Sequence, residues 1–202
     1  IAVSGNTLEI ADTDVVRAIA LGTLPEGPFG YVLCAEESYD PPTSSLDADG
    51  QGIPYAVYGF GAHLAEVEVD IRLGTVKVLK ITAAHDVGRA INPLLLEGQI
   101  EGGVAQGLGM ALMEEFTPGR GENLHDYLIP TIGDVPPIES ILIECPSPDG
   151  PYGAKGIGEQ ALIPTAPAIL NAIANATGIR MMRTPATPGR IRAAILAREP
   201  AR

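Results

Sequence analysis

The chain has 202 residues, of which 46% are hydrophobic, so it is long enough to bury one large core or two small ones and is not a disordered segment. Its 25 acidic and 13 basic side chains give a net charge of −12, which argues against nucleic acids and anionic membrane surfaces as partners. No apolar run approaches the roughly 18 residues that a bilayer-spanning helix needs.

The two cysteines, Cys34 and Cys145, lie far apart and in no metal-ligand spacing. The sequence therefore offers no cysteine ligands for a zinc site or an iron–sulfur cluster, and it favours a reducing, cytoplasmic compartment. The chain begins with Ile1 rather than Met, so we expect a piece of a longer polypeptide. The low aromatic content of 4% and the absence of Trp indicate that part of its apolar surface faces another polypeptide.

The first 54 residues carry weak signals for regular structure. Residues 8–10 have a strand pattern, and residues 12–21 predict a short amphipathic helix capped by Asp12 or Thr13. A strand is expected over residues 31–35. The segment 40–54, rich in Pro, Ser, Asp and Gly, predicts a loop that would serve as a lid or a subunit contact.

Residues 55–82 contain two runs in which apolar and polar side chains alternate, over 63–69 and 76–81, with a glycine-bearing turn between them. This pattern predicts a β-hairpin. His63 and Glu66 would lie on opposite faces of its first strand, so we expect no shared metal site. We interpret His63 as a solvated or core-edge histidine.

A helix is predicted to begin at Pro93, which is favoured at the first helical position, and to run to about residue 116. Each glycine inside a helix costs about 1 kcal/mol relative to alanine, yet this segment has five: Gly98, Gly102, Gly103, Gly107 and Gly109. Close approach of a neighbouring element or a ligand would explain them. Gln99 would then offer its carboxamide to a ligand such as a pterin. The alternative is a tightly buried helix in which the backbone satisfies Gln99.

Short apolar runs and the turn-forming residues between them predict the remaining elements. Residues 117–137 predict a loop with a short strand, and residues 141–144 predict another strand. A turn over 146–151 leads into a glycine-rich segment. Residues 160–177, rich in Ala, Leu and Ile, predict a helix that stops at Gly178, and a last helix is expected over 188–198.

The glycine-rich segment is Gly153-Ala154-Lys155-Gly156-Ile157-Gly158-Glu159. Its glycines let the main chain come close to a ligand. Glu159 is expected in the first turn of the next helix, where the helix dipole favours an ionised carboxylate that can act as a general base. A plain helix N-terminal glutamate is the alternative. The segment lacks the Gly-Lys-Ser/Thr ending of a phosphate loop and the Gly-x-Gly-x-x-Gly spacing of a dinucleotide-binding fold.

Three blocks of this sequence occur together in one known family. They are Asp86-Val87-Gly88-Arg89 with Ile91-Asn92-Pro93, Glu97-Gly98-Gln99-Ile100-Glu101-Gly102-Gly103 with Gln106-Gly107-Leu108-Gly109, and Gly153 to Glu159. The similarity extends through residues 65–70, 126–131 and 185–191, and it covers the chain from roughly residue 55 to the end. With these blocks in the family's order, the chain resembles the C-terminal part of the molybdenum-binding subunit of the xanthine dehydrogenase/aldehyde oxidase family of molybdenum hydroxylases.

The resemblance implies an α+β fragment of a larger molybdopterin-binding domain, with a strand- and hairpin-rich portion over 1–83 and a helix-rich, cofactor-contacting portion over 84–202. It implies oxidation of an aldehyde or an N-heteroaromatic carbon with water as the oxygen source. The cofactor would be molybdopterin, alone or as its cytosine dinucleotide. The expected partners are the remaining molybdopterin-binding portion and an iron–sulfur subunit or domain, with an FAD-carrying flavin subunit as an optional further one.

The resemblance also implies roles for individual residues. Glu159 matches the catalytic base that deprotonates an oxygen ligand of molybdenum, Ile157 and Gly158 match main-chain positions beside the metal, and Gln99 matches a glutamine that hydrogen-bonds the molybdopterin. Gln160 stands where the family usually has Pro. Because the family's upstream loops around the molybdenum have no counterpart here, we expect the isolated chain to be inactive. A non-catalytic fragment that only completes a partner chain is the alternative function.

Overall fold

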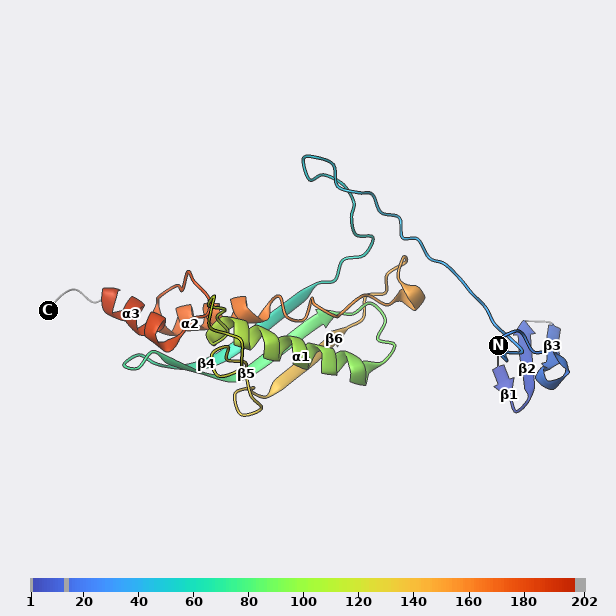
Figure 1. Cartoon of the computed structure of the whole chain (residues 1–202), viewed down its shortest axis with the longest axis horizontal. Coiled ribbons are helices and arrows are strands. Elements are labelled where there is room, and N and C mark those ends of the chain that lie inside the picture. Colours follow the sequence, from blue (N-terminus) through green and yellow to red (C-terminus); the bar gives the residue numbers. More distant parts are fainter. Residues whose placement is uncertain (1, 13–14, 199–202) are drawn as a thin grey trace. The chain divides into compact units, whose positions relative to one another are not determined.

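The computed structural model describes residues 2–12 and 15–198, which form two compact units with the boundary after Pro42. The first unit is a three-stranded antiparallel sheet of β1 (Ala2–Ser4), β2 (Thr7–Asp12) and β3 (Val15–Ala20), in that order, followed by the short 3-10 helix Leu21–Thr23 (Figure 1). The strand predicted over 8–10 is confirmed as part of β2.

Two predictions for the first unit are wrong. The segment predicted as a helix over 12–21 contains strand β3, whose residues pair with β2 from Asp12↔Val15 to Thr7↔Ala20. Val15, Val16 and Ile19 are β-branched, and such residues fit a strand better than a helix. Residues 13 and 14, which include the predicted cap Thr13, lie outside the described part. Residues 31–35 form no strand, and the segment 40–54 is a loop as predicted.

The second unit is built on a sheet with the strand order β4-β5-β6. The hairpin of β4 (Gly61–Asp70) and β5 (Thr75–Asp86) is confirmed, and β6 (Ile138–Ile143) lies parallel to β5. A parallel pair needs a crossover connection, and α1 (Pro93–Leu112) provides it. The strand predicted over 141–144 belongs to β6, whereas residues 117–137 hold only an isolated bridge rather than a short strand.

The helices α1, α2 (Thr165–Thr177) and α3 (Pro188–Arg198) contact the sheet, and α1 and α2 pack on each other (Figure 1). The core lies between the helices and one face of the sheet. Among the described residues, its large, fully buried hydrophobic side chains are Ile81, Val87, Ile100, Val104, Leu108, Ile169, Ile173 and Ile191. On the opposite face, Leu64, Ile141 and Ile143 remain exposed.

Close packing around the buried half of α1 explains three of the helix's five glycines. A Cβ on Gly103 would lie 2.8 Å from Ala161 Cβ, and one on Gly107 would lie 2.5 Å from Thr165 Cβ. A Cβ on Gly109 would collide with the Glu114 side chain. Gly103 and Gly107 therefore let α1 approach the start of α2 closely, whereas Gly109 makes room for Glu114 and Pro130.

By contrast, a Cβ on Gly98 or Gly102 would meet no atom within 4 Å. These two glycines lie in the first half of α1, where Leu94 and Leu95 are 77% and 66% exposed. Internal packing therefore does not account for them.

The start of α2 differs from the prediction. The helix begins at Thr165 rather than at residue 160, because Pro164 disfavours helical backbone in the residue before it. Glu159 therefore lies in the turn over 158–164, and its predicted place in the first turn of the helix is wrong. Gly178 ends α2 as predicted, with a left-handed φ of 70°.

The final helix α3 is confirmed over Pro188–Arg198. None of the helices in the described part of the chain combines the length and the apolar character needed to cross a bilayer. The division of a single cofactor-binding domain at residue 83 stays a prediction.

Candidate functional site

A cavity of about 250 Å³ lies between the start of α1 and the glycine-rich segment. Polar and apolar side chains line it together: Val87, Arg89, Ile91, Asn92, Leu95, Leu96, Gln99, Ala154, Lys155 and Ile157. This mixture of apolar walls and a few hydrogen-bonding groups is typical of small-molecule and cofactor sites.

Backbone hydrogen bonds hold the two walls of the cavity together. The Lys155 N–H donates to the Val87 carbonyl at 3.0 Å, and the Arg89 N–H donates to the Gly153 carbonyl at 2.9 Å. Gly88 adopts a φ of 65°, and a Cβ there would collide with the Gly153 carbonyl. The block Asp86-Val87-Gly88-Arg89 and the glycine-rich segment, far apart in sequence, are therefore one structural unit.

The first turns of α1 place Gln99 at this cavity. The Asn92 side chain accepts a hydrogen bond from the Leu95 N–H at 3.2 Å, and Pro93 supplies the first helical residue. Gln99 is exposed on the following turn, and its carboxamide makes no hydrogen bond within the described residues. The interpretation in which the backbone satisfies a buried Gln99 is therefore wrong.

An ion pair made by Lys155, one of the cavity's lining residues, anchors the glycine-rich segment. Lys155 Nζ lies 2.5 Å from Asp86 Oδ2, and each side chain is only 11% exposed. Asp86 Oδ1 also accepts the Gly88 N–H at 3.0 Å, while the Asp86 carbonyl accepts Gln160 Nε2 at 3.1 Å. Burial by itself would raise the pKa of Asp86, but the hydrogen bonds from Lys155 and Gly88 and the lysine charge outweigh it and lower the pKa.

A second buried connection ties the start of α2 to the sheet. His63 Nε2 and His85 Nε2 are 2.7 Å apart, and His63 Nδ1 is 3.0 Å from Thr165 Oγ1. Burial, with the neighbouring His85 as a smaller cause, lowers the pKa of His63 to about 4; burial also lowers the pKa of His85. Both rings are therefore neutral at pH 7. His63 is a core-edge histidine, and its role as a link between β4 and α2 was not evident from the sequence.

The predicted site residues are only partly brought together. Gln99 and Ile157 line the same cavity, and Ile157 is buried. Gly158 and Glu159 follow along the turn, are exposed, and are not among the residues that line the cavity. The Glu159 carbonyl accepts the Leu162 N–H at 3.1 Å, whereas its carboxylate makes no hydrogen bond within the described residues.

Sequence reasoning missed the Asp86–Lys155 pair, although one signal was available. Asp86 follows the second strand of the predicted hairpin, which was expected to end at residue 81, and Lys155 is the only cation of the glycine-rich segment. Since buried charges are normally paired, the two residues were candidates for each other. The histidine pair gave no comparable signal, because His63 and His85 alternate with ordinary strand residues.

Comparison with known proteins places this chain in a family. A family model described as a molybdopterin cofactor-binding domain matches residues 9–136, a range that includes Gln99 and ends before the glycine-rich segment. The xanthine dehydrogenase molybdenum-binding subunit of Escherichia coli O157:H7 is 42% identical over 138 residues, which are 65% of this chain and 18% of that protein. The aldehyde oxidoreductase of Megalodesulfovibrio gigas is 41% identical over 208 residues, covering 96% of this chain and 22% of that protein.

The fold agrees with that of a solved relative. The aldehyde oxidoreductase structure from Desulfovibrio gigas superposes with a TM-score of 0.74 and 39% identity, covering 76% of this chain and 17% of that one. The predicted α+β class is thereby confirmed. The chain spans about a fifth of the length of these relatives. From the match over residues 9–136, this chain belongs to the molybdopterin cofactor-binding domain family.

Proposed function

We propose that this chain is part of a molybdenum hydroxylase that oxidises an aldehyde or an N-heteroaromatic carbon with water as the oxygen source. One observation carries the proposal: Gln99 and Ile157, from separate blocks of the sequence, line a single cavity. Family membership supports it, as do relatives named aldehyde oxidoreductase and xanthine dehydrogenase molybdenum-binding subunit.

The cavity fits the polar, ring-shaped part of a molybdopterin. A pterin ring carries hydrogen-bond donors and acceptors along its edge, and the free carboxamide of Gln99 offers both kinds of group. Ile157 and Leu95 supply an apolar wall. Gln99 and Ile157 would therefore hold the cofactor, which supplies two-electron redox chemistry when bound. Gly158, the next residue along the turn, is proposed to place its main chain beside the cofactor outside the cavity wall.

Glu159 is proposed as the general base. Its exposed carboxylate is free of hydrogen bonds within the described residues, so it is available to accept a proton from the water-derived oxygen that attacks the substrate carbon. The turn that carries it is held by Gln160 on the Asp86 carbonyl and by the Lys155–Asp86 pair. Gln160, which replaces the family's usual Pro, thus contributes a hydrogen bond to this turn.

The proposed enzyme needs more polypeptide than this chain. Around the cavity, Ile91, Leu94 and Leu95 expose 59%, 77% and 66% of their surfaces, and water must be kept from a site of this chemistry. The remaining molybdenum-binding portion would cover them, and iron–sulfur clusters and FAD on other chains or domains would carry electrons away. The isolated chain is accordingly proposed to be inactive. Two free, exposed cysteines fit a cytoplasmic location.

A matched pair of glutamines in α1 tests the cofactor site. Gln99 lines the cavity, whereas Gln106 is exposed in the same helix outside it. In the intact assembly, Gln99→Ala is expected to weaken retention of molybdenum and pterin by roughly three- to tenfold, the value of one or two hydrogen bonds. Gln106→Ala should retain the wild-type content. Equal cofactor content in both variants would contradict the proposed role of Gln99.

A further inference from the structure

Strand β4 has one open edge. It pairs with β5 along its ten residues, and no strand of the described residues pairs with its other edge. An exposed edge of this length presents a row of backbone N–H and C=O groups, and proteins normally shorten, bulge or cover such an edge. The bulge between Glu66 and Val67 interrupts the pairing only locally.

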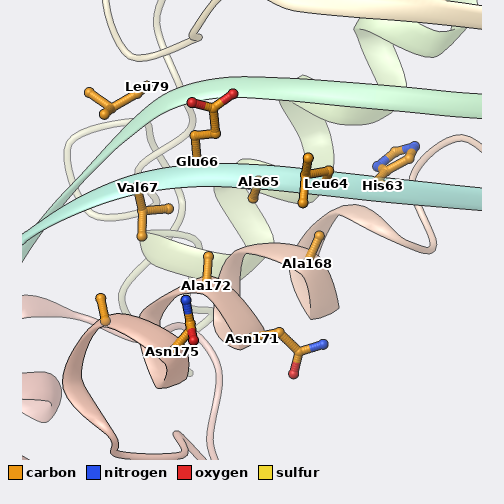
Figure 2. Close-up of a pocket in the computed structure, with 11 residues that line it drawn as sticks. His63, Leu64, Ala65, Glu66, Val67, Leu79, Ala168, Asn171, Ala172 and Asn175 are labelled. Atoms are coloured by element: carbon orange, nitrogen blue, oxygen red, sulfur yellow. The ribbon is translucent and has the colours of Figure 1, made fainter.

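A cavity of about 490 Å³ runs along this open edge (Figure 2). Side chains from both faces of β4 line it, with Ala65 and Val67 from the face toward α2 and Leu64 and Glu66 from the opposite face. Because both faces of the edge strand border it, this space reaches around the open edge of β4, and on its other side it extends to Leu79 of β5. We call this space the β4 groove.

The far wall of the β4 groove is a face of α2 made of short side chains. Figure 2 shows Ala168, Ala172, Asn171 and Asn175 on the helix beside β4. With Ala176, these residues recur at the three- and four-residue spacing of one helix face. The alanines keep this side of the groove free of long side chains, and the asparagine amides can both donate to and accept from a backbone.

We propose that the β4 groove binds an extended segment from the rest of the molybdenum-binding subunit, which adds to the open edge of β4 as a further strand. Strand addition to a free sheet edge is a common mode of polypeptide recognition. The inference rests on the proposed function, because that function places the chain within a larger subunit. The aldehyde oxidoreductase relative has about four fifths of its length outside the match, which supplies ample polypeptide.

The charges on β4 favour such a segment over a second copy of this chain. An antiparallel pairing of two β4 strands about a twofold axis near Val67 would bring Glu66 of each copy beside Glu68 of the other. Each chain also carries a net charge of −12. A segment that suits this edge would carry basic or hydroxyl side chains on the face of Glu66 and Glu68. Its alternate side chains, which point toward α2, would be small and apolar.

Hydrogen exchange of the intact assembly tests the proposal. Ala172→Arg places a long side chain in the groove wall, and Ala193→Arg places the same side chain on an exposed position of α3 outside it. The informative amides are those of β4 that point to the open edge rather than to β5. In wild type and Ala193→Arg, these amides should exchange at least about tenfold more slowly than in Ala172→Arg. Unchanged protection of β5 and α1 would show that the fold is intact. Should Ala172→Arg misfold, Ala176→Arg takes its place, because Ala176 is an exposed residue of the same groove.

Equal β4 protection in all variants would overturn the proposal. So would a dimer of the isolated chain, seen by sedimentation, that Ala172→Arg dissociates, because the occupant would then be a second copy. Molybdenum content and turnover are measured on the same samples. Groove-dependent protection without molybdenum would refute only the proposed function, while an active, molybdenum-loaded enzyme with equal protection in all variants would refute only strand addition.

Discussion

Replacing Gly103 with alanine tests why the buried half of α1 needs glycine. The new Cβ would lie 2.9 Å from the Ala161 carbonyl carbon and from the Leu162 nitrogen. Carbon atoms pack at about 3.5–4.0 Å, so the turn would have to move by about 0.6 Å or more. The obstacle is main chain, which cannot rotate away as a flexible side chain can. Gly102 is the matched control, because a Cβ there meets no atom within 4 Å.

The two substitutions are expected to change the free energy of unfolding in opposite directions. Gly102→Ala should stabilise the chain by about 1 kcal/mol through helix propensity alone. Gly103→Ala gains the same term but loses about 2–3 kcal/mol to overpacking, leaving a net destabilisation of about 1–2 kcal/mol. Urea unfolding of the two variants, followed by far-UV circular dichroism, measures both values. Equal stability of Gly103→Ala and Gly102→Ala would show that the contact of α1 with residues 161 and 162 does not require glycine.

Two further predictions concern the buried polar groups. Because the folded chain holds the pKa of His63 at about 4, below its usual 6.5, the folded state binds fewer protons; the free energy of unfolding should fall as pH drops from 6.5 toward 4. Urea midpoints across this range should lose part of that slope in His63→Gln, and an unaltered slope would assign it to other groups. Lys155→Met should destabilise the chain by about 3 kcal/mol, because it leaves Asp86 charged and unpaired. Lys80→Met, which removes an exposed partner of Glu139, should cost much less in the same urea assay, and equal losses would contradict this ranking.

Local signals predicted most elements of the second unit. Alternation gave the β4–β5 hairpin, Pro93 gave the start of α1, and Gly178 gave the end of α2. The errors arose where one local signal competed with another. Strand β3 has a sequence that also suits a short amphipathic helix, and pairing with β2 decides its structure. Pro164 delays the start of α2 beyond the beginning of its apolar run.

The site was less accessible to sequence reasoning. The roles of Gln99 and Ile157 came from family resemblance, since no periodicity indicates that they line one cavity. The Asp86–Lys155 pair joins residues 69 positions apart, and the His63–Thr165 contact joins residues 102 apart. Such contacts depend on tertiary structure, which brings together polar residues that look ordinary in their own segments.

The most direct test of the account is the turnover of Glu159→Gln in the intact assembly, with molybdenum content measured on the same sample. Glu122→Gln, which neutralises another exposed carboxylate, is the control. Loss of a general base predicts that Glu159→Gln reduces kcat by about a hundredfold or more, with wild-type molybdenum content. Wild-type turnover in Glu159→Gln with normal molybdenum would contradict the account and would identify the chain as a non-catalytic scaffold.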